Sequence, residues 1–312
     1  MQIGAAQLDV VARRTLARDV VELTLRRPDG GRLPDWAPGA HVAVTLPNGM
    51  VRPYSLCGDR WDPASYTLAV RREVAGTGGS AYVHDRLDVG STVGVGAPRT
   101  SFPLVPASAY VFVAGGIGVT PFLPMLQAAD RLGVPYRLVY LGRDADRMPY
   151  LADLTGRLGD GRLQVHVTGT AGRPDLAAAV GPVPDGGRVY GCGPPGLHLA
   201  LADLARGWPE HTLWTEAFGR PVGQDTDEAF TVRLRRTGVT VEVPRTTSLL
   251  EAIRAAGVDV LSSCRVGSCG ACETPVLRGA VEHRDTILTD DDAGVMFPCV
   301  SRARTGLLEL DL

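Results

Sequence analysis

The sequence predicts a multidomain protein, in which an antiparallel β-barrel domain is followed by an α/β parallel-sheet domain and then by a β-grasp α+β domain. Three observations along the 312 residues support this order. Short β-rich runs fill the first third, strands and helices alternate in the middle third, and four of the six cysteines fall in the last third. We expect the domains at 1–105, 106–220 and 229–312.

The first third has the pattern of a barrel. Apolar and polar residues alternate over 20–25, 41–46 and 66–70, which predicts strands. Turn sequences such as Pro28-Asp29-Gly30-Gly31 separate them. Many short strands without intervening helices predict a closed or nearly closed antiparallel barrel.

Two short runs in this barrel can bind a flavin. Arg52-Pro53-Tyr54-Ser55-Leu56 resembles the R-x-Y-S-[LF] flavin motif of ferredoxin–NADP⁺ reductase-like proteins, with an arginine for a phosphate and a tyrosine for the ring. Alone, it is also an ordinary strand sequence. Gly76-Thr77-Gly78-Gly79-Ser80 precedes a predicted helix at 81–87, whose first N–H groups can bind phosphate. A flexible connection with Ser80 as N-cap explains this run equally well, but together with Arg52 we favour phosphate binding.

The middle third begins with a buried strand and a glycine turn. The apolar run 110–114 is typical of a parallel strand. It leads into Gly115-Gly116-Ile117-Gly118-Val119-Thr120-Pro121, where Thr120 as N-cap and Pro121 at the first helical position predict a helix. Strand, turn and helix start together predict a pyrophosphate site, although neither G-x-G-x-x-G nor a P-loop matches strictly.

Further strands and helices alternate after this turn. A second glycine turn, Gly191-Cys192-Gly193-Pro194, also follows a strand, so we expect both turns at the carboxyl edge of a doubly wound parallel sheet, facing one crevice. The predicted strands are 136–141, 163–167, 188–190 and 212–216, and the predicted helices are 150–158, 175–180 and a run ending near 206.

The last third contains a metal-binding cysteine pattern. Cys264, Cys269 and Cys272 have the spacing C-x4-C-x2-C, and Cys299 follows, as in plant-type [2Fe–2S] proteins. Zinc is the alternative, but structural zinc sites usually take their ligands from two close pairs. We expect a disulfide framework less, because the sequence shows no secretory signal.

The rest of this third predicts a small mixed fold. We expect an exposed linker at 219–228, a hairpin of strands 230–234 and 239–243, and a helix that begins at the capping box Ser248-Leu249-Leu250-Glu251. His283 and Asp290-Asp291-Asp292 are expected at the surface, where they could also belong to a docking face.

The order of these motifs resembles the phthalate dioxygenase reductase family. The motifs are R-x-Y-S-L, G-G-I-G-x-T-P, C-G-P, E-x-F-G and C-x4-C-x2-C…C. Members contain FMN and a [2Fe–2S] cluster, use NADH, and supply Rieske oxygenases. The resemblance covers essentially the whole chain, and it implies a flavin domain, a nicotinamide nucleotide domain and a C-terminal ferredoxin domain.

The resemblance also implies roles for individual residues. The residues expected at FMN are Arg52, Tyr54, Ser55, Leu56, Val70, Gly78, Gly79 and Ser80. Those expected at NADH are Gly115, Gly116, Gly118, Thr120, Cys192, Gly193 and Pro194. The catalytic set is Ser55, Cys192, Glu216 and Phe218, with Phe218 stacked on the flavin until nicotinamide displaces it. The cluster ligands are Cys264, Cys269, Cys272 and Cys299.

Several of these residues have plainer interpretations. Thr77 stands where the family often has arginine, which removes a phosphate contact that Arg72 could replace. Cys192 could be a small buried apolar residue, and we favour a positioning role over a nucleophilic one. Cys57 is expected to be a structural thiol, and Phe218 would ordinarily belong to a core.

Together these features predict a converter of electron number. NADH gives up two electrons as hydride, a cluster accepts one, and a flavin can mediate between them. We expect an NADH-dependent oxidoreductase that supplies a partner oxygenase, either a Rieske oxygenase or a cytochrome P450. A non-enzymatic redox carrier or sensor is the alternative. Arg143 and Arg173 lie where a 2′-phosphate of NADPH could be recognised.

Composition excludes other classes of partner. A net charge of −2 indicates neither nucleic-acid nor anionic-membrane binding. No run approaches eighteen apolar residues. We expect a cytoplasmic monomer.

Overall fold

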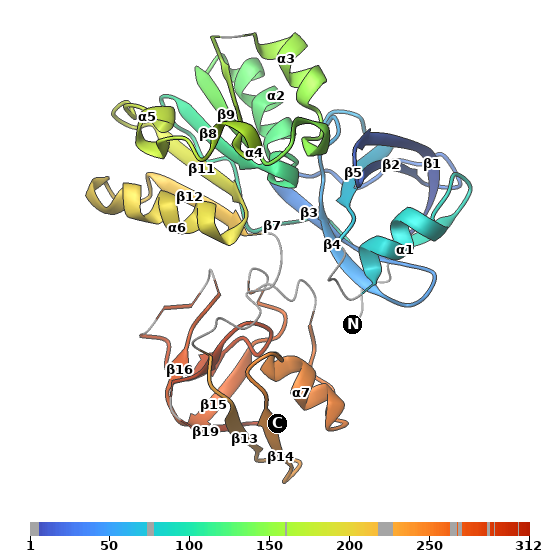
Figure 1. Ribbon diagram of the computed structural model, residues 1–312. Coiled ribbons are helices and arrows are strands. Elements are labelled where there is room, and N and C mark those ends of the chain that lie inside the picture. Colours follow the sequence, from blue (N-terminus) through green and yellow to red (C-terminus); the bar gives the residue numbers. More distant parts are fainter. Residues whose placement is uncertain are drawn as a thin grey trace. The chain divides into compact units, whose positions relative to one another are not determined.

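The computed structural model describes residues 6–73, 78–159, 161–217, 227–262, 267, 270–285, 288–289, 291–304 and 306–312. The chain forms two compact units, Met1–Phe218 and Gly219–Leu312 (Figure 1). The first unit contains both the expected barrel and the expected parallel sheet. None of the helices in the described residues is long and apolar enough to cross a membrane.

The barrel of the first unit is one antiparallel sheet. Its strand order is β4-β3-β6-β1-β2-β5, with β7 paired to β3. A bridge between Leu56 and Leu68 joins the regions of β4 and β5, the two edge strands, so the sheet is nearly closed. The strands are β1 (Ala6–Ala17), β2 (Val20–Arg26), β3 (Ala40–Thr45), β4 (Val51–Ser55), β5 (Ser65–Arg71), β6 (Thr92–Val95) and β7 (Arg99–Thr100).

The second part of the first unit is a five-stranded parallel sheet. Its order is β10-β9-β8-β11-β12, where the strands are β8 (Tyr110–Gly115), β9 (Tyr136–Gly142), β10 (Leu163–Val167), β11 (Arg188–Gly193) and β12 (Leu213–Ala217). Its helices are α2 (Phe122–Leu132), α3 (Leu151–Leu158), α4 (Thr168–Ala171), α5 (Leu176–Val180) and α6 (Pro195–Leu204). Short 3₁₀ turns are η1 (Gly116–Val119), η2 (Ala145–Arg147) and η3 (Ala205–Gly207).

Successive residues of β8 pack into different cores. Phe112 packs with α2 and α3, whereas Val111 and Val113 pack with α5 and α6. The two helix pairs accordingly lie on opposite sides of the sheet (Figure 1). This alternation explains why β8 is apolar throughout, and it confirms the doubly wound α/β prediction. Barrel residues Val20 and Cys57 join the core of α2 and α3, which unites the barrel with the sheet.

The second unit has a β-grasp arrangement. Its sheet order is β14-β13-β19-β15-β17, with β13 parallel to β19 and the other pairs antiparallel. Ser248 caps α7 (Leu249–Ala255) as expected, since its Oγ accepts the Glu251 N–H at 3.2 Å. The strands are β13 (Phe230–Leu234), β14 (Thr240–Val243), β15 (Thr274–Arg278), β17 (Val295–Met296) and β19 (Leu307–Leu310), beside a separate pair β16 (Val281–Glu282) and β18 (Arg302–Ala303).

Two predicted helix starts were wrong by one or two residues. The chain makes the 3₁₀ turn η1 before α2, so Pro121 is the N-cap and the Thr120 hydroxyl donates back to Ile117 O at 3.0 Å. Helix α1 (Gly79–Arg86) begins after Gly78, whose φ of 88° favours glycine. Ser80 therefore lies in the first turn.

Two predictions of surface exposure in the second unit were also wrong. Asp227, expected in the exposed linker, has a fully buried side chain that pairs with Arg284 at 2.5 Å and with Arg302 at 3.7 Å. The side chain of His283 is only 5% exposed, and its Nδ1 lies 3.6 Å from the buried carboxylate of Asp285. Tertiary partners override the polar character of these segments. Linker residues 219–226 and Asp290 lie outside the described residues, whereas Glu228, Asp291 and Asp292 are exposed as expected.

Candidate cofactor sites

The two expected phosphate-binding runs of the barrel meet in the structure. A Cβ at Gly79 would lie 2.6 Å from Arg52 Nε, so the guanidinium packs directly on the first turn of α1. Arg52 also donates to Val51 O at 2.8 Å. Positive charge and the free N–H groups of a helix start therefore occupy one place, a combination that suits a phosphate. Thr77 lies outside the described residues, and Arg72 is held by Asp85 at 2.6 Å.

The other residues expected at FMN differ in what they can offer. Burial raises the pKa of the half-buried Tyr54 to about 12, so its hydroxyl stays protonated. Ser55 is buried at the end of β4. The side chains of Leu56 and Val70 belong to the barrel core, so these two residues can offer only backbone groups to a ligand.

The two glycine turns touch each other at the carboxyl edge of the parallel sheet. Ala114 of β8 is the register partner of Cys192 of β11. A Cβ at Gly115 would lie 2.5 Å from Pro194 Cδ, and one at Gly118 would clash with the carbonyl of Cys192. Glycine is therefore required for the close approach of these turns. Gly116, with φ 56°, faces open space instead, because the atom nearest to a Cβ there is Arg71 Nη1 at 4.0 Å.

Glu216 and Cys192 are paired across β12 and β11. Burial raises the pKa of Glu216 to about 8, and its Oε2 is buried with no hydrogen-bond partner among the described residues. Burial, followed by the charge of Glu216, raises the pKa of the Cys192 thiol well above its usual value. A protonated thiol fits packing or positioning better than nucleophilic attack. The orphaned carboxyl oxygen fits a ligand that brings its own hydrogen-bonding group. Phe218 lies outside the described residues.

Sequence reasoning missed His198, which supports the second glycine turn. Its Nε2 lies 2.9 Å from Gly193 O, and because a carbonyl only accepts, this nitrogen carries the hydrogen. Burial lowers the pKa of His198, so the ring stays neutral near pH 7. The residue stands five positions after Gly193 in α6, and nothing in the local pattern distinguishes it.

The cysteine loop of the second unit packs against the Cys299 segment. Cys272 and Cys299 are 4% and 2% exposed and share one core. A Cβ at Gly267, whose φ is 73°, would lie 2.7 Å from Val300 Cγ2. Two buried thiols on either side of such a contact suit a metal cluster. Cys264 and Cys269 lie outside the described residues.

Asp285, which sequence reasoning also missed, joins these two segments. Its fully buried carboxylate accepts the Leu288 N–H at 2.6 Å and the Ser301 hydroxyl at 3.2 Å. A Cβ at Gly267 would lie 2.8 Å from Asp285 Cβ. Asp285 therefore lies between the cysteine loop and the chain just after Cys299. In the sequence Asp285 simply follows Arg284, and nothing in this pair of residues predicts a buried carboxylate beside the cysteine loop.

Comparisons with known proteins show the family of this chain. Residues 232–304 match the model of the 2Fe-2S iron-sulfur cluster binding domain. The phthalate dioxygenase reductase of Burkholderia cepacia is 38% identical, over 99% of this chain and 98% of that protein. The chain belongs to the phthalate dioxygenase reductase family.

The other relatives fit this family. The phthalate 4,5-dioxygenase oxygenase reductase subunit of Pseudomonas putida is 34% identical over 99% of this chain and 97% of that protein. A solved phthalate dioxygenase reductase is 36% identical, with a TM-score of 0.79 over 99% of this chain and 98% of that chain. An intact type IV self-sufficient cytochrome P450 monooxygenase is 38% identical, with a TM-score of 0.78; this chain spans 41% of its length.

Membership confirms the predicted class and fold. This reductase is an NAD(P)H-dependent oxidoreductase of the oxygenase-reductase type, with a [2Fe–2S] ferredoxin domain at its C-terminal end. The multidomain prediction of barrel, parallel sheet and β-grasp ferredoxin is confirmed as well.

Proposed function

We propose that this reductase takes hydride from NADH onto FMN and passes single electrons through a [2Fe–2S] cluster to a Rieske-type oxygenase. The observation that carries the proposal is the direct contact of the two glycine turns beside the orphaned carboxyl of Glu216, in the same unit as the Arg52–Gly79 phosphate site. A nicotinamide pocket and a flavin pocket within one unit are what hydride transfer requires.

The barrel residues have the chemistry to hold and orient FMN. Arg52 and the start of α1 would bind its phosphate, and Tyr54 and Ser55 would lie along its ring. When bound, the flavin accepts a pair of electrons and returns them singly. FMN is favoured over FAD by the resemblance to the family. Mass spectrometry of the flavin released from the purified protein tests this choice, and FAD alone would contradict it.

The parallel sheet has the chemistry to bind NADH. Gly115, Gly116, Gly118 and Thr120 would bind the pyrophosphate and ribose, and Cys192, Gly193 and Pro194 would face the nicotinamide. With its raised pKa, Glu216 is largely protonated at pH 7 and could donate a hydrogen bond to the nicotinamide amide. Neutral packing groups around it would also exclude water from the transfer site.

The choice of NADH over NADPH depends on two exposed arginines. Arg143 follows β9 and Arg173 follows α4, and both side chains are accessible to a 2′-phosphate. The resemblance favours NADH. Comparing kcat/KM for the two nucleotides tests this choice, and a preference for NADPH that disappears in R143A or R173A would reverse it.

The ferredoxin unit would deliver electrons to the partner. Cys264, Cys269, Cys272 and Cys299 would hold the cluster. Relatives named for phthalate dioxygenases favour a Rieske partner, and the similarity to a self-sufficient P450 makes a P450 the second candidate. A non-enzymatic carrier does not fit a family of reductases.

The deciding experiment has two stages. Stopped-flow absorbance should show NADH bleaching the flavin within milliseconds to seconds, and no bleaching would refute the proposed function. The reduced protein is then mixed with a Rieske oxygenase or with a P450, and faster reduction of the P450 would reverse the choice of partner. Size-exclusion chromatography tests the expected monomer.

A further inference from the structure

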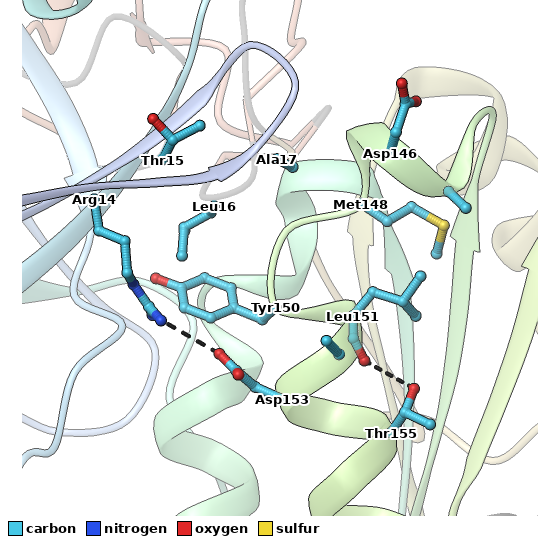
Figure 2. Close-up of a pocket in the computed structure, with 12 residues that line it drawn as sticks. Arg14, Thr15, Leu16, Ala17, Asp146, Met148, Tyr150, Leu151, Asp153 and Thr155 are labelled. Atoms are coloured by element: carbon cyan, nitrogen blue, oxygen red, sulfur yellow. Dashed lines mark hydrogen bonds and ion pairs between the residues drawn. The ribbon is translucent and has the colours of Figure 1, made fainter.

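Within the first unit, Tyr150 lies where the barrel strands meet the parallel-sheet part, just before α3 (Figure 2). Its side chain is buried, and its φ of 60° is in the left-handed region that bulky residues seldom adopt. Such a backbone persists only where surrounding contacts hold it in place. The contacts of the Tyr150 side chain should therefore show what holds the backbone in this conformation.

The Tyr150 hydroxyl bonds to the barrel. It donates to Glu22 Oε2 of β2 at 2.6 Å, a length typical of a hydrogen bond to a carboxylate. The Cys57 sulfur lies 3.4 Å from the Tyr150 hydroxyl oxygen. Burial raises the pKa of Tyr150, and burial raises the pKa of Cys57 to about 12, so both groups keep their protons at neutral pH.

An arginine makes a second link at the same junction. Arg14 of β1 donates to Glu22 Oε1 at 3.1 Å and lies 3.7 Å from Asp153 Oδ2 of α3. Figure 2 shows the Arg14–Asp153 contact beside the Tyr150 ring, along the groove between the two parts. Arg14 and Asp153 are both more than half exposed, so this ion pair adds little by itself. The Tyr150–Glu22 bond is better shielded from water, because the Glu22 side chain is only 15% exposed.

Hydrogen bonds and short stretches of chain connect this junction to both expected cofactor sites. The buried Tyr140 hydroxyl lies 2.9 Å from Pro149 O, next to Tyr150, and 3.2 Å from Gly116 O in the first glycine turn. On the other side, Cys57 follows Ser55 by two residues. A continuous set of contacts thus joins the nucleotide turn to the flavin strand.

We propose that Tyr150 is a positioning residue, which holds the nucleotide-binding part in register with the flavin-binding barrel so that hydride transfer is fast. The inference rests on the proposed function. Transfer between two stacked rings is sensitive to displacements of about 1 Å, which can slow a reaction by about 100-fold. Loss of the Tyr150 hydroxyl should therefore slow hydride transfer without weakening the binding of NADH or of the flavin.

The test is the limiting rate of flavin reduction in the holoprotein, measured by stopped flow at saturating NADH. Tyr150→Phe should lower this rate about tenfold or more, with the dissociation constants of NADH and flavin within about twofold of wild type. Tyr66→Phe is the matched control, because the buried Tyr66 hydroxyl donates to Pro34 O at 2.6 Å inside the barrel. This control should keep the wild-type rate.

Glu22→Ala provides a second route to the same loss. It should slow reduction at least as much as Tyr150→Phe does, because it also removes the carboxylate that Arg14 binds. The double variant should be no slower than the slower single variant, because both variants remove the Tyr150–Glu22 bond. A wild-type rate in Tyr150→Phe would overturn the inference alone. Equal slowing in Tyr66→Phe would do the same, since it would indicate general destabilisation. No bleaching of wild type would overturn the proposed function and this inference together.

Discussion

The two units differ in how the chain supplies their expected cofactor sites. In the first unit, the contributing residues extend from Arg52 to Glu216, and several act through a backbone that only glycine permits. In the second unit, the four expected ligands are side chains that fall between Cys264 and Cys299. The difference teaches that single substitutions should weaken the first kind of site by degrees and should abolish the second.

The largest expected effect is the loss of one cysteine. Cys299→Ser should remove the cluster absorbance and lower NADH-driven cytochrome c reduction by about 100-fold or more, because the remaining ligands cannot complete the site. Reduction of ferricyanide directly by the flavin should persist. Cys57→Ser is the control and should retain a full complement of iron. A C299S protein with wild-type iron content would break the comparison.

The next largest effect concerns the buried Asp227. Asp227→Ala leaves Arg284 and Arg302, each no more than 10% exposed, without their shared carboxylate. Breaking a buried ion pair costs about 3–5 kcal/mol, and we expect the lower end of this range because Arg284 keeps its bond to Glu282 at 2.9 Å. Denaturant unfolding, followed by the cluster absorbance, measures the free energy of unfolding of the second unit. The exposed pair of Arg236 and Asp311 supplies the control, since water and salt screen this pair and D311A should therefore cost far less stability than D227A. A D227A cost as small as that of the control would contradict the expectation.

A graded effect is expected at the glycine turns. Gly118→Ala forces the first turn away from the carbonyl of Cys192, and we expect flavin reduction by NADH to slow about tenfold. Reduction of the cluster by dithionite should not change. Gly156→Ala, in α3 where a Cβ meets no atom within 4 Å, is the matched control and should be neutral or slightly stabilising. Abolished flavin binding in G118A would show that this site is not graded.

The smallest effect is a pH dependence in the first unit. Because the pKa of Glu216 is about 8 in the folded protein and near 4.5 when unfolded, the unfolded state loses its proton first as pH rises. The stability that comes from keeping Glu216 neutral is therefore complete below pH 4.5 and is lost as pH rises to 8. The Tm of wild type should fall by roughly 3 °C or more relative to that of E216Q over this range. Parallel curves would contradict the raised pKa.

Features fixed by neighbouring residues could be predicted from the sequence. Ser248 caps its helix, the apolar run at 110–114 is the central strand of a parallel sheet, and the cysteine spacing indicated the ferredoxin domain. Each of these depends on hydrogen bonds or packing within a few positions along the chain. The local sequence pattern is therefore enough to predict these features.

Features fixed by distant partners could not be predicted. Tyr150 and Glu22 are 128 positions apart, so nothing near either residue indicates their bond. Asp227 looked like part of an acidic linker because its partners, Arg284 and Arg302, lie far along the chain. Helix α2 starts one residue later than predicted, because the 3₁₀ turn η1 precedes it and Pro121, rather than Thr120, is the N-cap.

The parallel pairing of β13 with β19 has a practical consequence for attaching new groups. β13 and β19 are the first and last strands of the second unit, and they run in the same direction. The chain therefore enters β13 at one end of the strands and leaves β19 at the opposite end. Leu312 is held beside the β13–β14 turn, where its carbonyl accepts the Thr237 N–H at 3.0 Å. Asp227 lies just before β13, and Leu312 lies just after β19. A tag, an electrode tether or a fused haem domain joined after Leu312 would thus leave the unit from the end of the strands opposite to Asp227.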